Sequence, residues 1–103
     1  MIKHKLIFDE IILKQLKNLG KDRALQKIIS KILDKLEEKG PEEGDIIDSR
    51  LHIYEVKRKN PPIRLYFKYN LATDEIYIFE YEMKTSPKKQ RETISKLRKR
   101  LES

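Results

Sequence analysis

The side chains best suited to chemistry in this 103-residue chain are cations in the stretch from Arg50 to Lys84. This stretch contains three strand-like segments joined by two short turns. Its central and final cations are Lys57, Arg58, Lys59, Arg64, Lys68 and Lys84. Alternation along a strand puts Lys57 and Lys59 on one face, and pairing of adjacent strands would bring Arg64 near them. A sheet that gathers cations on one face is suited to binding an anionic group.

The net charge of the chain, +7, is concentrated in two segments. Residues 1–49 hold ten basic and ten acidic side chains and are neutral, whereas residues 69–83 carry −4. Residues 50–68 carry +5 and residues 84–103 carry +6. A localised excess of this kind predicts a polyanionic partner, most simply a nucleic acid. A solvated charged face is the alternative interpretation.

The composition excludes several other kinds of site. The chain has no cysteine, and therefore no disulfide, thiolate metal site or thiol nucleophile. Its two histidines occupy strand positions that we assign to the core side, and its paired acids lack a third ligand at a diagnostic spacing. We therefore expect no metal and no cofactor. Without a signal-like or membrane-spanning apolar run, we also expect a soluble cytoplasmic protein that does not associate with membranes.

The elements that must position the cations begin with a strand over Ile2–Phe8. Asp9 can cap a helix that runs to about Leu19, and Asp22 can cap a second helix that runs to about Lys39. Each helix carries one apolar stripe, so the pair forms a hairpin that must bury both stripes on a sheet. Residues 42–48 are expected to form a polar loop that leads into that sheet.

Three strands follow, over residues 51–59, 63–69 and 75–83, and a basic helix starts near Ser86 and Pro87. In the middle strand one face is apolar, with Ile63, Leu65, Phe67 and Tyr69. The other face presents Arg64, Tyr66 and Lys68. The sequence therefore predicts one α+β domain over residues 1–103. In it, a strand and a helical hairpin pack on an antiparallel sheet, in the order β-α-α-β-β-β, before a basic C-terminal helix.

Three short motifs add a family resemblance. They are Tyr54-Glu55-Val56-Lys57, Arg64-Leu65-Tyr66-Phe67, and Tyr81-Glu82-Met83-Lys84-Thr85 followed by Pro87-Lys88-Lys89. In their types and order the chain resembles the RelE/ParE toxin superfamily. Within it, the chain is similar to the phage-derived, HigB-like branch of type II toxin–antitoxin mRNA interferases. It departs from that pattern at Lys57, where the branch carries arginine, and at Met83, where it carries lysine.

The resemblance implies a ribosome-dependent endoribonuclease that cleaves mRNA without metal and inhibits translation. It uses the ribose 2′-hydroxyl as nucleophile, so it needs a base, a phosphate-binding group and a proton donor. A lysine can act as base when neighbouring cations lower its pKa, which favours Lys57 with Lys59 as substitute. Arg64 suits the phosphate, and Lys84 or Tyr81 would donate the proton or bind the phosphate as a second clamp. The residues expected to bind RNA are Arg58, Tyr66, Lys68, Lys88, Lys89 and Arg91.

Two other functions are compatible with the same sequence. A basic sheet with exposed tyrosines can bind RNA without cutting it, as an inactive RelE-fold protein would. A ParE-like relative would instead inhibit DNA gyrase, although Lys57, Arg64 and Lys84 favour the nuclease. The resemblance also implies a cognate antitoxin as partner, beside mRNA and the ribosome. Acidic or amphipathic segments of that antitoxin would cover the basic face or displace the last helix.

Overall fold

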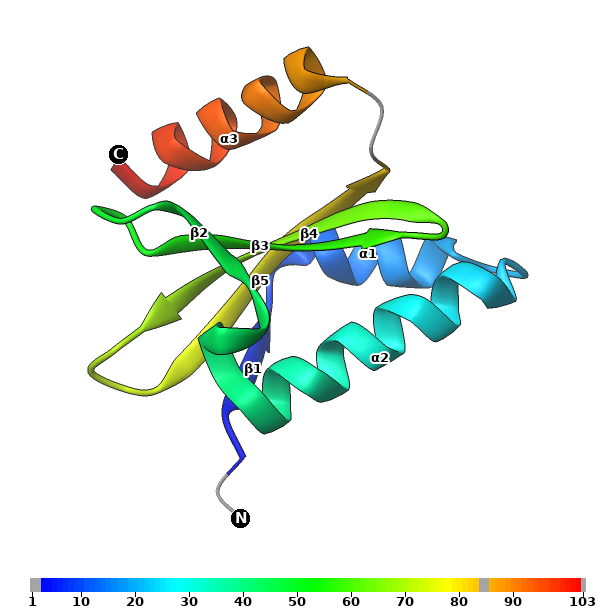
Figure 1. Ribbon diagram of the computed structural model, residues 1–103, viewed down its shortest axis with the longest axis horizontal. Coiled ribbons are helices and arrows are strands. Elements are labelled where there is room, and N and C mark those ends of the chain that lie inside the picture. The colour runs from blue at the N-terminus through cyan, green and yellow to red at the C-terminus, as the bar shows by residue number, and fades with distance from the viewer. Residues whose placement is uncertain (1–2, 84–85, 103) are drawn as a thin grey trace.

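The computed structural model describes residues 3–83 and 86–102 and forms three layers, with a sheet between two helical layers (Figure 1). The elements are β1 (Lys5–Phe8), α1 (Glu10–Asn18), α2 (Arg23–Lys39), the 3₁₀ turn η1 (Gly40–Glu43), β2 (Asp45–Asp48), β3 (Ile53–Lys59), β4 (Pro62–Asn70), β5 (Glu75–Met83) and α3 (Pro87–Glu102). The hairpin of α1 and α2 covers one face of the sheet, and α3 crosses the other face. The predicted α+β class and the predicted order of the main elements are confirmed.

The sheet differs from the prediction in two respects. Its strand order is β1-β5-β4-β3-β2, and β1 pairs with β5 in parallel, so the sheet is mixed rather than antiparallel. The segment that was expected to be a polar loop forms β2, which pairs with β3 at the edge of the sheet. Only four residues long and acidic at both ends, β2 lacks the alternation that marks a longer strand.

The helical hairpin forms as its caps and stripes predict. The Asp9 carboxylate accepts a hydrogen bond from the Ile11 N–H at 3.0 Å, and the Asp22 carboxylate accepts one from the Leu25 N–H at 3.1 Å. Helix α2 ends at Lys39 and is followed by Gly40, whose φ of 72° is a conformation that glycine adopts without strain. The buried stripes pack against one face of the sheet, in a cluster that includes Ile12, Ile29, Ile32, Leu36, Val56, Ile63, Leu65, Phe67, Ile76 and Ile78.

Helix α3 is docked on the opposite face. It begins at Pro87, and the Ser86 hydroxyl caps it by accepting a hydrogen bond from the Lys89 N–H at 3.2 Å. Leu97 is buried in a second apolar cluster with Ile53, Tyr66 and Phe79. Ion pairs add to this contact, from Arg98 to Asp48, from Arg100 to Asp9 and from Arg50 to Glu102. Among the helices that the structure describes, none has the length and apolar character needed to span a membrane.

The two histidines differ in their surroundings. His4 is partly buried before β1, and its Nδ1 lies 2.8 Å from a carboxylate oxygen of Asp74. His52 was expected within a strand, but it has a φ of 56° and lies in the turn before β3. That strand therefore begins at Ile53, two residues later than predicted.

Candidate functional site

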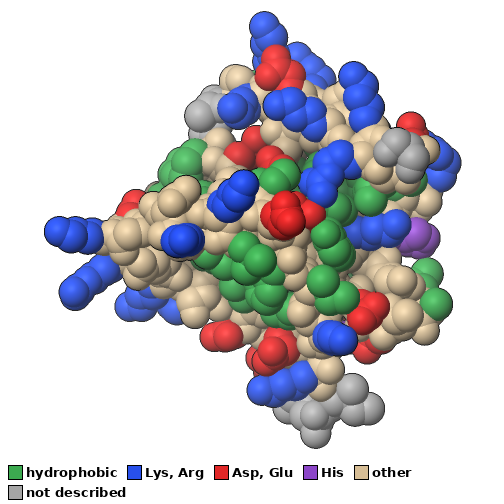
Figure 2. Space-filling view, turned by 180° about the vertical axis from the view of Figure 1, so that it is seen from behind, with side chains coloured by type: hydrophobic (Ala, Val, Ile, Leu, Met, Phe, Trp, Pro, Cys, Tyr) green, Lys and Arg blue, Asp and Glu red, His purple; other side chains and the backbone are tan. Residues whose placement is uncertain are grey.

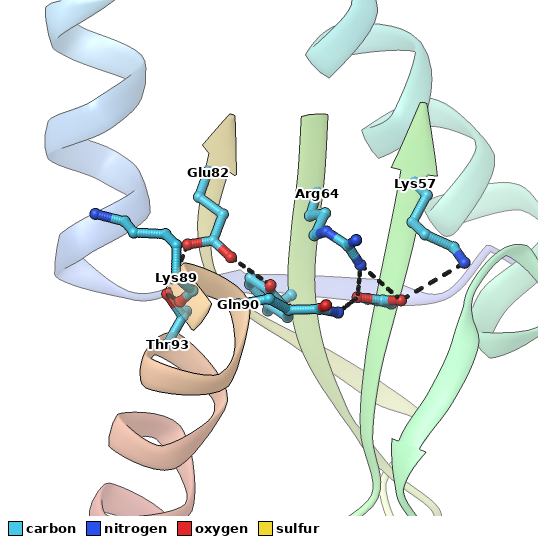
Figure 3. Close-up of polar contacts among 8 residues, drawn as sticks. Lys57, Arg64, Glu82, Lys89, Gln90 and Thr93 are labelled. Atoms are coloured by element: carbon cyan, nitrogen blue, oxygen red, sulfur yellow. Dashed lines mark hydrogen bonds and ion pairs between the residues drawn. The ribbon is translucent and has the colours of Figure 1, made fainter. Parts of the chain in front are cut away.

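Lys57 and Arg64 meet on the face of the sheet that α3 covers, at the end where α3 begins (Figure 3). The two residues are direct partners across the β3–β4 ladder, so their side chains point to the same face. Glu55 precedes Lys57 by two residues on β3 and shares that face. Gln90, in the first turns of α3, approaches the same point from the helix side.

The contacts among these four side chains centre on the carboxylate of Glu55. Arg64 Nη1 donates to both Glu55 oxygens, at 3.2 and 3.0 Å, and Gln90 Nε2 donates to Oε2 at 3.0 Å. Lys57 Nζ lies 3.8 Å from Oε1 of the same carboxylate. Glu55 is only 4% exposed. The side chains of Arg64 and Lys57 are 20% and 44% exposed, so both cations can be reached from solvent.

A second carboxylate on the same face, Glu82, ties α3 to the sheet. It accepts hydrogen bonds from the Tyr66 hydroxyl at 2.5 Å and from the Thr93 hydroxyl at 2.6 Å. Tyr66 is fully buried, and that burial, together with the Glu82 hydrogen bond, raises the pKa of its phenol. Tyr66 therefore remains a neutral donor. Its ring is not exposed for stacking on a base, contrary to the expectation from strand alternation.

Of the other residues with expected catalytic roles, Lys59 lies at the same end of the sheet and Tyr81 points away from the site. Lys59 is exposed near the tip of the β3–β4 hairpin, two residues beyond Lys57. Tyr81 lies on the opposite face, where it packs against the α1–α2 cluster and its backbone N–H donates to Gln15. The structure therefore does not bring the Tyr81 side chain to Arg64. Lys84 falls outside the described residues.

The residues expected to bind RNA lie in different parts of the structure. Arg58 points away from Arg64 and pairs with Glu43 of η1 at 2.8 Å. Lys68 lies further along β4, beside a cavity of about 310 Å³ that Tyr77, Phe79 and Arg100 also line. By contrast, Lys88, Lys89 and Arg91 are all exposed on the first turns of α3. Figure 2 shows Lys and Arg side chains crowded at the top of the molecule, where α3 lies.

Two contributors to this site were not assigned a role from the sequence. Glu55 is the only acid among residues 50–68, and it stands two positions before Lys57 on the same predicted strand. These two features of the sequence could have indicated that it lies beside the cations. Gln90 gives no such signal, because its role depends on how α3 lies on the sheet. Together these residues hold two cations beside the first turns of α3, where the helix N-terminus also favours an anion. The arrangement is chemically suited to binding a phosphate group.

Comparison with known proteins identifies the fold. No family model matches the chain, and no protein of curated function matches it in sequence. Solved structures do match. The isolated RelE toxin of Escherichia coli is 18% identical, with a TM-score of 0.68 over 91% of this chain and 98% of that one. The chain has the RelE toxin fold.

Two toxin–antitoxin complexes share the RelE-like fold. A chain of the RelBE2 complex from Mycobacterium tuberculosis is 15% identical, with a TM-score of 0.65 over 84% of this chain and 97% of that one. A chain of the YoeB–YefM complex from Staphylococcus aureus is 20% identical, with a TM-score of 0.60 over 80% of this chain and 98% of that one. At these identities the likeness establishes the fold, and function must be argued from the site.

Proposed function

We propose that this protein is the toxin of a type II toxin–antitoxin system, and that it cleaves mRNA on the ribosome without a metal ion, thereby inhibiting translation. The observation that carries the proposal is the pairing of Lys57 with Arg64 on a RelE-like sheet, beside the start of a basic helix. The similar chains come from proteins named as toxins or toxin–antitoxin complexes, which supports the same role. The order of the three sequence motifs supports the HigB-like branch.

The proposed reaction joins the ribose 2′-oxygen to phosphorus and breaks the bond from phosphorus to the 5′-oxygen. The 2′-hydroxyl gives up its proton to a base, and the departing 5′-oxygen takes one from an acid, leaving a 2′,3′-cyclic phosphate and a 5′-hydroxyl. Arg64 uses Nη1 for Glu55 and retains other N–H groups that can donate to the phosphate. Lys57 is the proposed base, with Lys59 as substitute, and Lys84 is the proposed acid.

Exposed cations next to this site would hold the RNA strand. Lys88, Lys89 and Arg91 extend the positive surface from the Arg64 end along α3. Contacts from such side chains to phosphates supply affinity without reading sequence. The proposed partners are therefore mRNA and the ribosome, together with a cognate antitoxin that neutralises the protein.

The test is to add purified protein to translating ribosomes and to map the 5′ ends of the resulting mRNA fragments. We expect cuts in phase with codons, and we expect Arg64→Ala to reduce their rate about 10²–10³-fold, since one stabilising donor is lost. Lys57→Ala should also abolish efficient cutting. Lys31→Ala removes one exposed charge on the remote helix α2 and should cut as the unmodified protein does.

The outcomes separate the competing functions. RNA binding without cuts would refute the nuclease and favour a non-cleaving binder, and inhibition of DNA supercoiling by gyrase would favour a ParE-like poison. If the unmodified protein cuts while both Arg64→Ala and Lys57→Ala retain full activity, the site is placed wrongly.

A further inference from the structure

We propose that Glu55 is a positioning residue: its carboxylate holds Arg64 and Lys57 in their working geometry and, through Gln90, makes that geometry depend on the docking of α3. The inference rests on the proposed function and concerns a residue that contacts the cations rather than the RNA. Four contacts carry it, all converging on one buried carboxylate.

Repulsion between the two cations of this site must be offset. Lys57 and Arg64 face each other directly across β3 and β4, and like charges in that relation destabilise a sheet. Glu55 pairs with Tyr66 in the ladder, so it is the diagonal neighbour of Arg64. From there it reaches Arg64 at 3.0 Å and lies 3.8 Å from Lys57. Its negative charge therefore allows the two cations to remain side by side.

The Glu55 carboxylate is buried, and its charge must therefore be compensated. A carboxylate that is 4% exposed is costly to ionise unless charged and polar donors compensate it. Glu55 meets that condition through Arg64, Gln90 and Lys57, which occupy both of its oxygens. Little room is left for a substrate hydroxyl to approach it. The Glu55 carboxylate is therefore suited to fixing the plane of the Arg64 guanidinium, and it is poorly placed to accept a proton from RNA.

Helix α3 supplies one of the donors to this carboxylate. The Gln90 amide and Arg64 Nη1 share Oε2 of Glu55, each at 3.0 Å (Figure 3). If α3 leaves the sheet, that oxygen loses one donor and water reaches the ion pair, which weakens it. The arrangement of Arg64 is thereby linked to a helix that supplies neither Arg64 nor the proposed base, Lys57.

Glu55→Gln tests the proposal, because it keeps the shape and removes the charge. Glu75→Gln is the control. Glu75 begins β5 at the other end of the ladder from Arg64, where its carboxylate lies 3.7 Å from Lys5. In the ribosome cleavage assay we expect Glu55→Gln to lower kcat about 10²-fold with little change in KM, since misplacement by about 1 Å has that cost. The control should keep kcat close to that of the unmodified protein.

A double-mutant cycle supplies the decisive readout. If Glu55 acts through Arg64, Glu55→Gln should cause little further loss in an Arg64→Ala background. An equal loss in both backgrounds would overturn the proposal, as would equal losses of kcat in Glu55→Gln and Glu75→Gln. Should Glu55→Gln fail to fold, Gln90→Ala leaves every charge in place and removes only the helix contact. It should lower kcat, and an unchanged kcat would refute the dependence on α3.

One measurement distinguishes failure of this inference from failure of the proposed function. If the unmodified protein cuts no mRNA, the proposed function is refuted, and nitrogen-detected NMR of the Arg64 guanidinium still tests the positioning. Restricted rotation in the unmodified protein that is released in Glu55→Gln supports the inference. Identical guanidinium signals in the two proteins overturn it.

Discussion

Replacing Leu97 with alanine would measure how strongly α3 is held on the sheet. Leu97 is 1% exposed and packs with Ile53, Tyr66 and Phe79 in the cluster between α3 and the sheet. Truncating a buried leucine loses its transfer free energy and leaves a cavity, at a cost of about 2–5 kcal/mol. The free energy of unfolding of Leu97→Ala should fall by an amount in this range.

The ion pairs of α3 are weaker contributors than this leucine. The side chains of Arg98 and Arg100 are 46% and 42% exposed, whereas the Asp48 and Asp9 carboxylates that they meet are largely buried. Each pair is expected to contribute only about 0–1 kcal/mol, because solvent screens the guanidinium and burial of the carboxylate costs free energy. The apolar contact therefore dominates the docking of α3. Since α3 carries Gln90 to Glu55, the same substitution should also slow RNA cleavage.

Urea denaturation followed by circular dichroism gives the global stability, and hydrogen exchange over residues 87–102 reports local opening of α3. If α3 unfolds together with the sheet, both measurements should change; if it opens separately, the exchange of its amides should change most. The control Leu71→Ala removes a leucine that is 69% exposed, and it should alter stability by less than about 0.5 kcal/mol. Unchanged global stability combined with unchanged exchange in α3 would refute the reasoning.

Two pH-dependent predictions follow from the other carboxylates near α3. Burial opposes ionisation of Asp9, but hydrogen bonds from the Ile11 N–H, Arg100 and Tyr77 outweigh it and lower the pKa of Asp9. Asp9→Asn keeps an oxygen for the helix cap but removes the charge, so it should lower the Tm at pH 7. The difference in Tm from the unmodified protein should shrink in acid, because protonation of Asp9 then removes the same stabilising charge from the unmodified protein. Burial, reinforced by Glu82, raises the pKa of Glu80, so Glu80→Gln should raise the Tm at pH 7 and lose that advantage in acid. Thermal unfolding from pH 7 down to pH 3 checks both, and differences that do not vary with pH would contradict them.

Much of the fold could be predicted from local signals. Asp9 and Asp22 mark the helix starts, and the stripes of α1 and α2 have the period of one buried helix face. Alternation in β4 correctly separates its hairpin side from its α3 side. These features are encoded within a few residues of sequence, so they need no knowledge of the tertiary arrangement.

The strand β5 shows why the rest could not be predicted. Its two faces look mixed in the sequence because the ladder with β4 shifts register, pairing Tyr66 with Glu80 and Phe67 with Ile78. The extra residue, Phe79, faces α3, and the alternation resumes beyond it with Tyr81 on the hairpin side. The place of a bulge depends on packing from both sides. Sequence position alone therefore could not show that Tyr81 and Arg64 are on opposite faces.

The charge pattern of the sequence correctly indicated where the cations are concentrated along the chain. It did not show that these cations lie on different surfaces of the fold. Much of the cationic excess serves the fold: Arg50 pairs with Glu102, and Arg58 pairs with Glu43. Other cations dock α3 through Asp48 and Asp9. The exposed or partly exposed cations that gather at one end are Lys57, Lys59, Arg64, Lys88, Lys89 and Arg91. A polyanion that approaches the protein therefore meets a group of cations where β3, β4 and the first turns of α3 converge, which is also where Glu55 fixes the two central cations.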